Sequence, residues 1–346
     1  MPYKTNFNNW RNRVILVMIF GLFLSCNNPN KKNRPNKKTE PKSQNETSIS
    51  TQQRANFTGT LLSGHIALTK NQLFKLNEEL DSFFQVSLAN VNIKGASLHF
   101  TDLTSQQSFS INGDLKFVPA SLLKLPILIA IYKMEELRPG TLKKQISHFS
   151  TLHNEKNSNL IENEFFHYQQ NKIYTVEEYL AVMIRYSDND ATLSLLNFLD
   201  SIQPGFLEKV EEELQASIPN TSTNVDDIVH VHHFATFLNV LYECKYLNPS
   251  NSNKALELLN TSRYPLGFRK KLPSSLPIAH KFGVRFTENN TNSKPSIQLH
   301  QVAIIYHPKR PFLLSVMTKG SNIEDLRTVL QEAAFLTYSY LDQLPD

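Results

Sequence analysis

Residues 118–132 read VPASLLKLPILIAIY, which places a serine and a lysine three positions apart at the start of an apolar run. Residues at this spacing share one face of a helix, so the Lys124 amine can reach the Ser121 hydroxyl. A helix that is apolar on all sides is a buried helix, and burial lowers the pKa of a lysine. The stretch therefore predicts a buried helix that begins near Ser121 and carries a Ser–Lys pair suited to nucleophilic catalysis.

The start of this helix suits acyl transfer. Backbone N–H groups and the positive end of the helix dipole would face a negative charge that develops on a substrate oxygen. Pro126 would clash with the Leu122 carbonyl in a regular helix, so we expect a kinked or tightened first turn. A lone S-x-x-K is a weak signal, because a chain of this length contains about one by chance. Its structural alternative is a surface lysine beside a capping serine.

Two further short motifs follow along the chain. Residues 187–189 read SDN and lie between two helical patterns, where a helix cap or turn is the structural alternative. Residues 280–283 read HKFG and begin inside a predicted strand over residues 278–286. The structural alternative there is an edge strand with its lysine facing outward and its glycine at a bulge. Each motif lies on the type of element that acyl transfer needs, so the ordered set predicts a single site.

The ordered set S-x-x-K, S-D-N and K-x-G resembles that of the class A β-lactamase and penicillin-binding protein family, whose third motif is K-T-G. The resemblance extends over most of residues 73–346. It implies an α/β fold with an antiparallel sheet flanked by helices and an inserted helical subdomain at about residues 117–272. It also implies that the substrate is a β-lactam or a peptidoglycan stem peptide.

The resemblance assigns a role to each matching position. Ser121 is similar to the nucleophile, and Lys124 is similar to its base, acting directly or through water. Ser187 would relay a proton to the departing nitrogen, and Asn189 would hold the side-chain amide of the substrate. Lys281 would supply positive charge for the substrate carboxylate and for Ser187.

The third motif would also complete the oxyanion hole. The resemblance assigns this role to the backbone N–H groups of Ser121 and of Val284, which follows Gly283. Each such donor is worth about 2.7–4 kcal/mol. The hydroxyl residue of the family's motif is Phe282 here, and Arg285 is a candidate to bind the substrate carboxylate in its place.

The segment after Asn189 departs further from the family. Class A β-lactamases carry an E-x-x-L-N signature there, whose Glu activates the water that hydrolyses the acyl-enzyme. The chain has no such signature, and residues 257–260 (ELLN) are one residue short and too late. We expect the acidic residues of this segment to lie on an amphipathic, solvated helix; they are Glu208, Glu211, Glu212 and Glu213.

Hydrophobic periodicity predicts the remaining elements. A helix is expected over about 73–83, a strand over 96–100 with a hairpin partner near 109–111, strands at 302–306 and 312–318, and a helix at about 323–344. Strands from both ends of the chain would pair in one antiparallel sheet. The terminal helices would cover one face of that sheet.

The first 26 residues predict a lipoprotein signal peptide. Lys4, Arg11 and Arg13 precede an apolar run at residues 14–24, which at about 16 Å is too short to span a bilayer core of roughly 30 Å. The run ends in LFLSC, which is similar to a bacterial lipobox with Cys26 as the lipidated residue. Simple secretion is the alternative. We expect an exported protein of the periplasm or cell envelope, anchored by lipid to a bacterial membrane.

Composition divides the rest of the chain. Residues 27–69 are polar at their start and predict a flexible tether, followed by the catalytic domain at 70–346. The formal net charge of the chain is +5, and residues 1–56 alone carry +8. Residues 57–346 therefore carry −3, which gives no support for a nucleic-acid-binding surface. We expect no cofactor and no metal. Among His230, His232 and His233, the first and last would share a helix face, but no third ligand of suitable spacing lies nearby. The oligomeric state stays open.

Three functions are compatible with these motifs. The first is a β-lactamase-like serine hydrolase that forms an acyl-enzyme on Ser121 and releases it slowly. The second is a D,D-peptidase or another cell-wall amidase, and the third is a lipoprotein that binds β-lactam or peptidoglycan without turnover. The missing Glu favours the second and third over an efficient β-lactamase. The intact motif residues argue against an inactive pocket.

Overall fold

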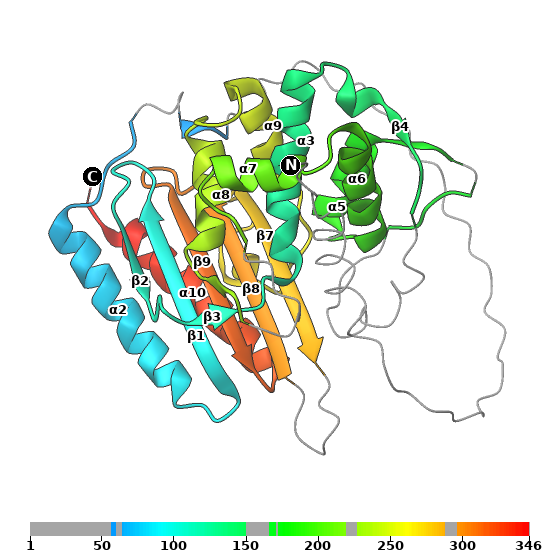
Figure 1. Cartoon of the computed structure of the whole chain (residues 1–346). Coiled ribbons are helices and arrows are strands. Elements are labelled where there is room, and N and C mark those ends of the chain that lie inside the picture. Colours follow the sequence, from blue (N-terminus) through cyan, green and yellow to red (C-terminus); the bar gives the residue numbers. More distant parts are fainter. Residues whose placement is uncertain are drawn as a thin grey trace, which may run out of the picture.

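Strands from both ends of the chain pair in one antiparallel sheet, as predicted. β1 (Ile93–Asp102) and β2 (Ser108–Ile111) come from the N-terminal part, and β7 (Ile278–Thr287), β8 (Ser296–Ile305) and β9 (Phe312–Gly320) from the C-terminal part. Their order is β2-β1-β9-β8-β7, with every neighbouring pair antiparallel (Figure 1). The computed structural model describes residues 57–59, 64–149, 166–170, 172–218, 227–287 and 296–345.

Two long helices cover one face of the sheet (Figure 1). α2 (Lys70–Leu88) begins at a capping box made by Thr69 and Gln72, and α10 (Ile323–Gln343) is capped by Asn322. Their apolar residues recur at helical spacing and pack on the sheet in one hydrophobic core. This layer confirms the predicted terminal helices.

The opposite face of the sheet is covered by the helical part of the chain. α3 (Lys124–Leu137) is its central helix, and α5 (Val176–Arg185), α6 (Asn189–Ile202), α7 (Phe206–Glu213), α8 (His233–Tyr242) and α9 (Pro249–Asn260) surround it. Short elements connect them: β3 (Lys116–Phe117), η2 (Ala120–Leu123), η3 (Thr141–Lys143), β4 (Gln145–Ile146), β5 (Tyr174–Thr175), β6 (Val229–His230) and η4 (Phe268–Lys271). A second hydrophobic core fills this side and contacts the sheet through α8. The fold is the predicted α/β architecture.

The body begins earlier than residue 70, which corrects the predicted end of the tether. The Phe57 N–H donates to Asn253 Oδ1 at 2.6 Å, and the Tyr306 hydroxyl donates to the Phe57 carbonyl at 2.8 Å. Leu68 is buried, and its N–H donates to Asp102 Oδ2 at 2.9 Å. The predicted tether rests on the polar composition of its first part, residues 27–56, whereas residues 57–69 include the apolar Phe57 and Leu68.

The predicted signal peptide at 1–26, its Cys26, and residues 27–56 of the predicted tether lie outside the described residues. Within the described part of the chain, the helices are too short or too polar to cross a membrane.

Candidate active site

Ser121 lies in a tight turn that leads into the buried helix. η2 is a 3-10 turn, and the α-helical part begins only at Lys124. Pro126 falls in the first turn of α3, where a helix needs no N–H from the residue, so the expected tightening is present. Ala120 has a φ of 49°, an unfavourable left-handed conformation for a residue with a side chain, directly before Ser121. This turn holds Ser121 half-buried at the end of α3 that points toward the sheet edge.

Lys124 is positioned to accept a proton from Ser121. Its Nζ lies 2.9 Å from Ser121 Oγ and 3.0 Å from Asn189 Oδ1. Only 3% of Lys124 is exposed, and burial lowers its pKa to about 8 although the Asp188 carboxylate acts in the opposite direction. A lysine with this pKa has a substantial neutral fraction near neutral pH, as a general base requires.

The SDN motif joins α5 to α6 and faces the two site lysines. Ser187 has a φ of 56°, and Asp188 caps α6 by accepting from the Ala191 N–H at 2.7 Å. The predicted capping alternative therefore describes Asp188. Its neighbours Ser187 and Asn189 instead contact Lys281 and Lys124.

Lys281 lies inside the protein, so the outward-facing alternative is wrong. It is fully buried, and its Nζ donates to Ser187 Oγ at 2.7 Å and to the Phe282 carbonyl at 2.8 Å. Burial and, to a smaller extent, the charge of Lys124 hold the pKa of Lys281 well below its usual range. The pairing of β7 with β8 continues without a shift through Gly283, so the bulge of that structural alternative is absent as well.

Gly283 brings the edge strand against Ser121. A Cβ at this position would lie 3.1 Å from the Ser121 backbone nitrogen and 3.3 Å from that of Leu122. Such contacts are tighter than a side chain normally tolerates, so glycine permits the approach of β7 to the start of η2. The backbone of Gly283 and Val284 consequently runs beside the Ser121 N–H, where the resemblance places the oxyanion hole.

The Phe282 side chain packs away from the Ser121 site. Its ring is 2% exposed and stacks on Tyr264 with centroids 4.3 Å apart. The Lys281 Nζ lies 4.4 Å from the Phe282 ring centroid, a cation–π distance. The two aromatic rings thus support Lys281 from the apolar side of β7. Arg285 is half-buried on the same strand.

Tyr168 is a site neighbour that the motifs did not reveal. Its hydroxyl donates to Asp188 Oδ1 at 2.7 Å, and burial with this carboxylate raises the pKa of Tyr168. Burial raises the pKa of Asp188 as well. The aromatic content of residues 166–179 was the available signal, but only the fold brings Tyr168 to the SDN loop.

The acidic helix differs from its prediction at one residue. α7 exposes Glu212 and Glu213, as expected, but Glu211 is only 2% exposed. The Glu211 Oε2 accepts from the Ile218 N–H at 3.4 Å, and the Glu211 carbonyl accepts from the Ala216 N–H at 2.9 Å. Because α7 packs on α3, this position is enclosed, and the Glu211 carboxylate binds the chain that follows α7.

The histidines lie apart from the Ser–Lys pair. The rings of His230 and His232 stack with centroids 5.6 Å apart, and His233 Nε2 lies 3.1 Å from the Ala216 carbonyl. Among the described residues, no group of three or more His, Cys, Asp or Glu side chains could hold a metal ion.

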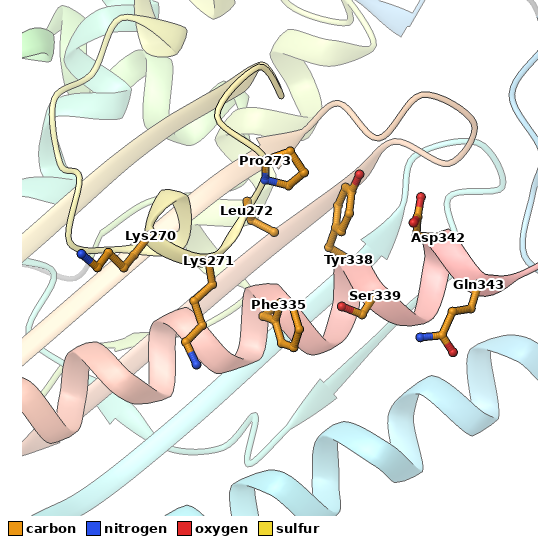
Figure 2. Close-up of a pocket in the computed structure, with 9 residues that line it drawn as sticks. All are labelled: Lys270, Lys271, Leu272, Pro273, Phe335, Tyr338, Ser339, Asp342 and Gln343. Atoms are coloured by element: carbon orange, nitrogen blue, oxygen red, sulfur yellow. The ribbon is translucent and has the colours of Figure 1, made fainter.

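A separate pocket of about 450 Å³ lies between η4 and α10 (Figure 2). Lys270, Lys271 and Phe335 contribute to its lining. The pocket lies on the face of the sheet that α2 and α10 cover, and it is distinct from the Ser121 site.

Comparison with known proteins agrees with this arrangement. Residues 76–341 match the Beta-lactamase2 family, the beta-lactamase enzyme family. A search of curated proteins returned no match. The fold is similar to that of a mutant of PBP-A solved as an acyl-enzyme complex with penicillin G, at 20% identity and a TM-score of 0.61 over 79% of this chain and 98% of that chain.

Class A β-lactamases share the same fold. The enzyme from Mycobacterium abscessus aligns with a TM-score of 0.61 and 17% identity, over 76% of this chain and 99% of that chain. A β-lactamase from Xanthomonas campestris aligns with a TM-score of 0.62 and 16% identity, over 77% of this chain and 98% of that chain. With a family match that covers most of its 346 residues, the chain belongs to the beta-lactamase enzyme family.

Proposed function

We propose that the protein is a serine hydrolase that opens β-lactam amides through an acyl-enzyme on Ser121. The observation that carries this proposal is the 2.9 Å contact between Ser121 Oγ and the buried Lys124 Nζ. A serine hydroxyl is a weak nucleophile unless a base lies within hydrogen-bond reach. Lys124, with a pKa of about 8, is such a base.

In the acylation step, neutral Lys124 accepts the Ser121 proton while Oγ bonds to the lactam carbonyl carbon. The backbone N–H groups of Ser121 and Val284 would stabilise the oxyanion. The intermediate collapses when the carbon–nitrogen bond breaks. The nitrogen takes a proton from Ser187 while Ser187 takes up the proton that Lys124 accepted, so both residues return to their starting protonation states. Lys281, which donates to Ser187 Oγ, would stabilise both that hydroxyl and the carboxylate of the substrate.

We propose that hydrolysis of the acyl-enzyme is the slow step. A general base contributes about 10²–10⁴ in rate, and the sequence lacks the signature that supplies this base in class A β-lactamases. We do not assign this role to Glu211, whose Oε2 accepts a hydrogen bond from the Ile218 N–H at 3.4 Å. Acylation depends on other groups and should be fast.

Rapid mixing with a chromogenic cephalosporin tests this order of rates. We expect a burst of about one product per enzyme, followed by a slow steady state. A linear trace with a high turnover number would show that another group, such as Lys124, activates water efficiently.

A D,D-peptidase is the second candidate, and the same missing base favours it. The similarity to a mutant of PBP-A solved as an acyl-enzyme complex with penicillin G supports a site that a β-lactam acylates. Steady-state turnover of the cephalosporin, measured beside intact-mass detection of an adduct, separates the alternatives. Turnover indicates a β-lactamase, and a stable adduct without turnover indicates a peptidase-like site. If neither turnover nor an adduct is found, the protein is a binding protein.

The proposed location is the bacterial cell envelope, with Cys26 as the lipidated residue. The support is the short apolar run that ends at residues 25–26 (SC). Cys26→Ser should move the protein from the membrane pellet to the soluble fraction and remove the lipid mass. Unchanged membrane association would instead indicate an uncleaved signal anchor.

A further inference from the structure

The two faces of β7 differ in what covers them. Ala279 belongs to the core under the helical part, whereas Ile278 and Phe282 belong to the core under α10. Successive side chains of a strand alternate between faces. Lys281, Gly283 and Arg285 therefore share the face that looks toward Ser121.

These three positions are ordered around the nucleophile. Lys281 contacts Ser187, and Gly283 lies against the Ser121 backbone nitrogen. Arg285 follows about 7 Å farther along the strand, so it lies about 13 Å from Lys281 in backbone position. Along β7, the position that lies against Ser121 therefore falls between Lys281 and Arg285. Arg285 is too far along β7 to be a simple replacement for the missing hydroxyl at position 282.

Among the described residues, Arg285 has no counter-ion. Its Nη1 is buried without a hydrogen-bond partner, and burial lowers the pKa of its guanidinium. The residue directly opposite on β8 is Gln298, which donates to Asp227 Oδ1 at 2.8 Å. The second oxygen of Asp227 pairs with Lys319 at 2.6 Å. The carboxylate beside Gln298 is therefore occupied by other donors.

We propose that Arg285 binds an anionic group on the acyl side of the scissile bond. This inference rests on the proposed acyl-enzyme chemistry and narrows its substrate class. A substrate whose leaving-group carboxylate lies at Lys281 must extend its acyl part along β7 past Gly283, toward Arg285. A guanidinium suits a carboxylate there, because its planar donors bind both oxygens at once. The preferred acyl donor carries one carboxylate on each side of the bond that breaks.

Two penicillins that differ by one carboxylate test the inference. Benzylpenicillin has a neutral acyl side chain, and α-carboxybenzylpenicillin carries an added anion on it. Intact-mass time courses give the acylation rate constant for each compound. The result is a ratio: the rate constant for α-carboxybenzylpenicillin divided by that for benzylpenicillin. In Arg285→Gln this ratio should fall by about tenfold or more relative to wild type. Arg285→Lys should retain part of it.

Lys270→Gln is the matched control, because it removes one positive charge from an exposed residue near the pocket of Figure 2. Its ratio should equal that of the wild type. Arg285→Met, which places an apolar side chain in the half-buried position, serves if the Gln variant does not fold. An unchanged ratio in the Arg285 variants, or an equal fall in Lys270→Gln, would overturn the inference. Absence of an adduct with both penicillins would reject the proposed function, and this inference with it.

Discussion

The buried lysines of the Ser121 site differ from the cations on the face of α10 in how their charge is balanced. On the face of α10, Lys271 pairs with Glu332 and Arg327 pairs with Glu324. On the face of α3, Lys124 and Lys281 are buried, and the described residues place no carboxylate in an ion pair with either amine. Their donors bind hydroxyl, amide and carbonyl oxygens instead.

This difference has an energetic meaning. Removing an amine from water without an opposite charge costs free energy, and part of that cost is relieved when the amine loses its proton. Lys271, which pairs with a carboxylate, has a side chain that is 39% exposed and avoids most of this cost. The unpaired burial of Lys124 and Lys281 is therefore expected to favour reactivity at some expense of stability, whereas the cations of the α10 face keep their ion pairs.

The largest effect should follow from removing the central amine of the α3 face. Lys124→Ala should slow acylation of Ser121 by about 10²–10⁴, because the serine loses its base. Lys271→Ala, the matched change on the other face, should leave acylation unchanged. Both are measured by intact mass after timed exposure to a penicillin, with thermal unfolding as the check on folding. Similar losses in the two variants would show that the faces do not differ in function.

Lys281→Ala should have a smaller and more selective effect. A charge close to a substrate carboxylate is worth roughly 1.5–3 kcal/mol, so acylation by an anionic β-lactam should fall about 10- to 100-fold. A neutral ester substrate should lose far less. Parallel rate measurements on the two substrates decide the point. Equal losses would mean that Lys281 acts only through Ser187 or through the fold.

The pH dependence of acylation should report the lowered pKa of Lys124. Its amine is a base only when neutral, so the rate should rise with pH through about 8, roughly tenfold per unit below that value. Adduct formation timed between pH 6 and 10 gives the profile. A rise centred near the ordinary lysine value of 10.5 would contradict the proposed desolvation.

The smallest expected effect is the contribution of Lys124 to the pH dependence of the free energy of unfolding, and its sign follows from the lowered pKa. The folded pKa of Lys124, about 8, lies below its usual value of 10.5, so the unfolded chain binds the proton more tightly. The free energy of unfolding should therefore rise with pH between these two values, and the penalty should be complete below them. Denaturant unfolding of wild type and Lys124→Met, compared at pH 7 and 10, isolates this contribution. An equal pH dependence in both proteins would argue against it.

Local patterns predicted the sheet, the terminal helices and the three motifs, because periodicity and short-range spacing depend on neighbouring residues alone. In β7 the alternation separates apolar from polar positions, but it cannot show that helices cover the polar face. The sequence therefore also allowed a solvent-exposed Lys281. Glu211 is a similar case, since only the packing of α7 on α3 encloses it. The contact of Tyr168 with Asp188 also depends on tertiary structure.

The central claim is that Ser121 becomes acylated. Benzylpenicillin is incubated with the folded wild-type protein and with Ser121→Ala, and intact mass is followed by peptide mapping. We expect the wild type to gain the mass of one penicillin on the peptide that contains Ser121, and Ser121→Ala to gain none. A wild-type protein without any adduct or turnover, or an equal adduct on Ser121→Ala, would contradict the assignment of Ser121 as the nucleophile.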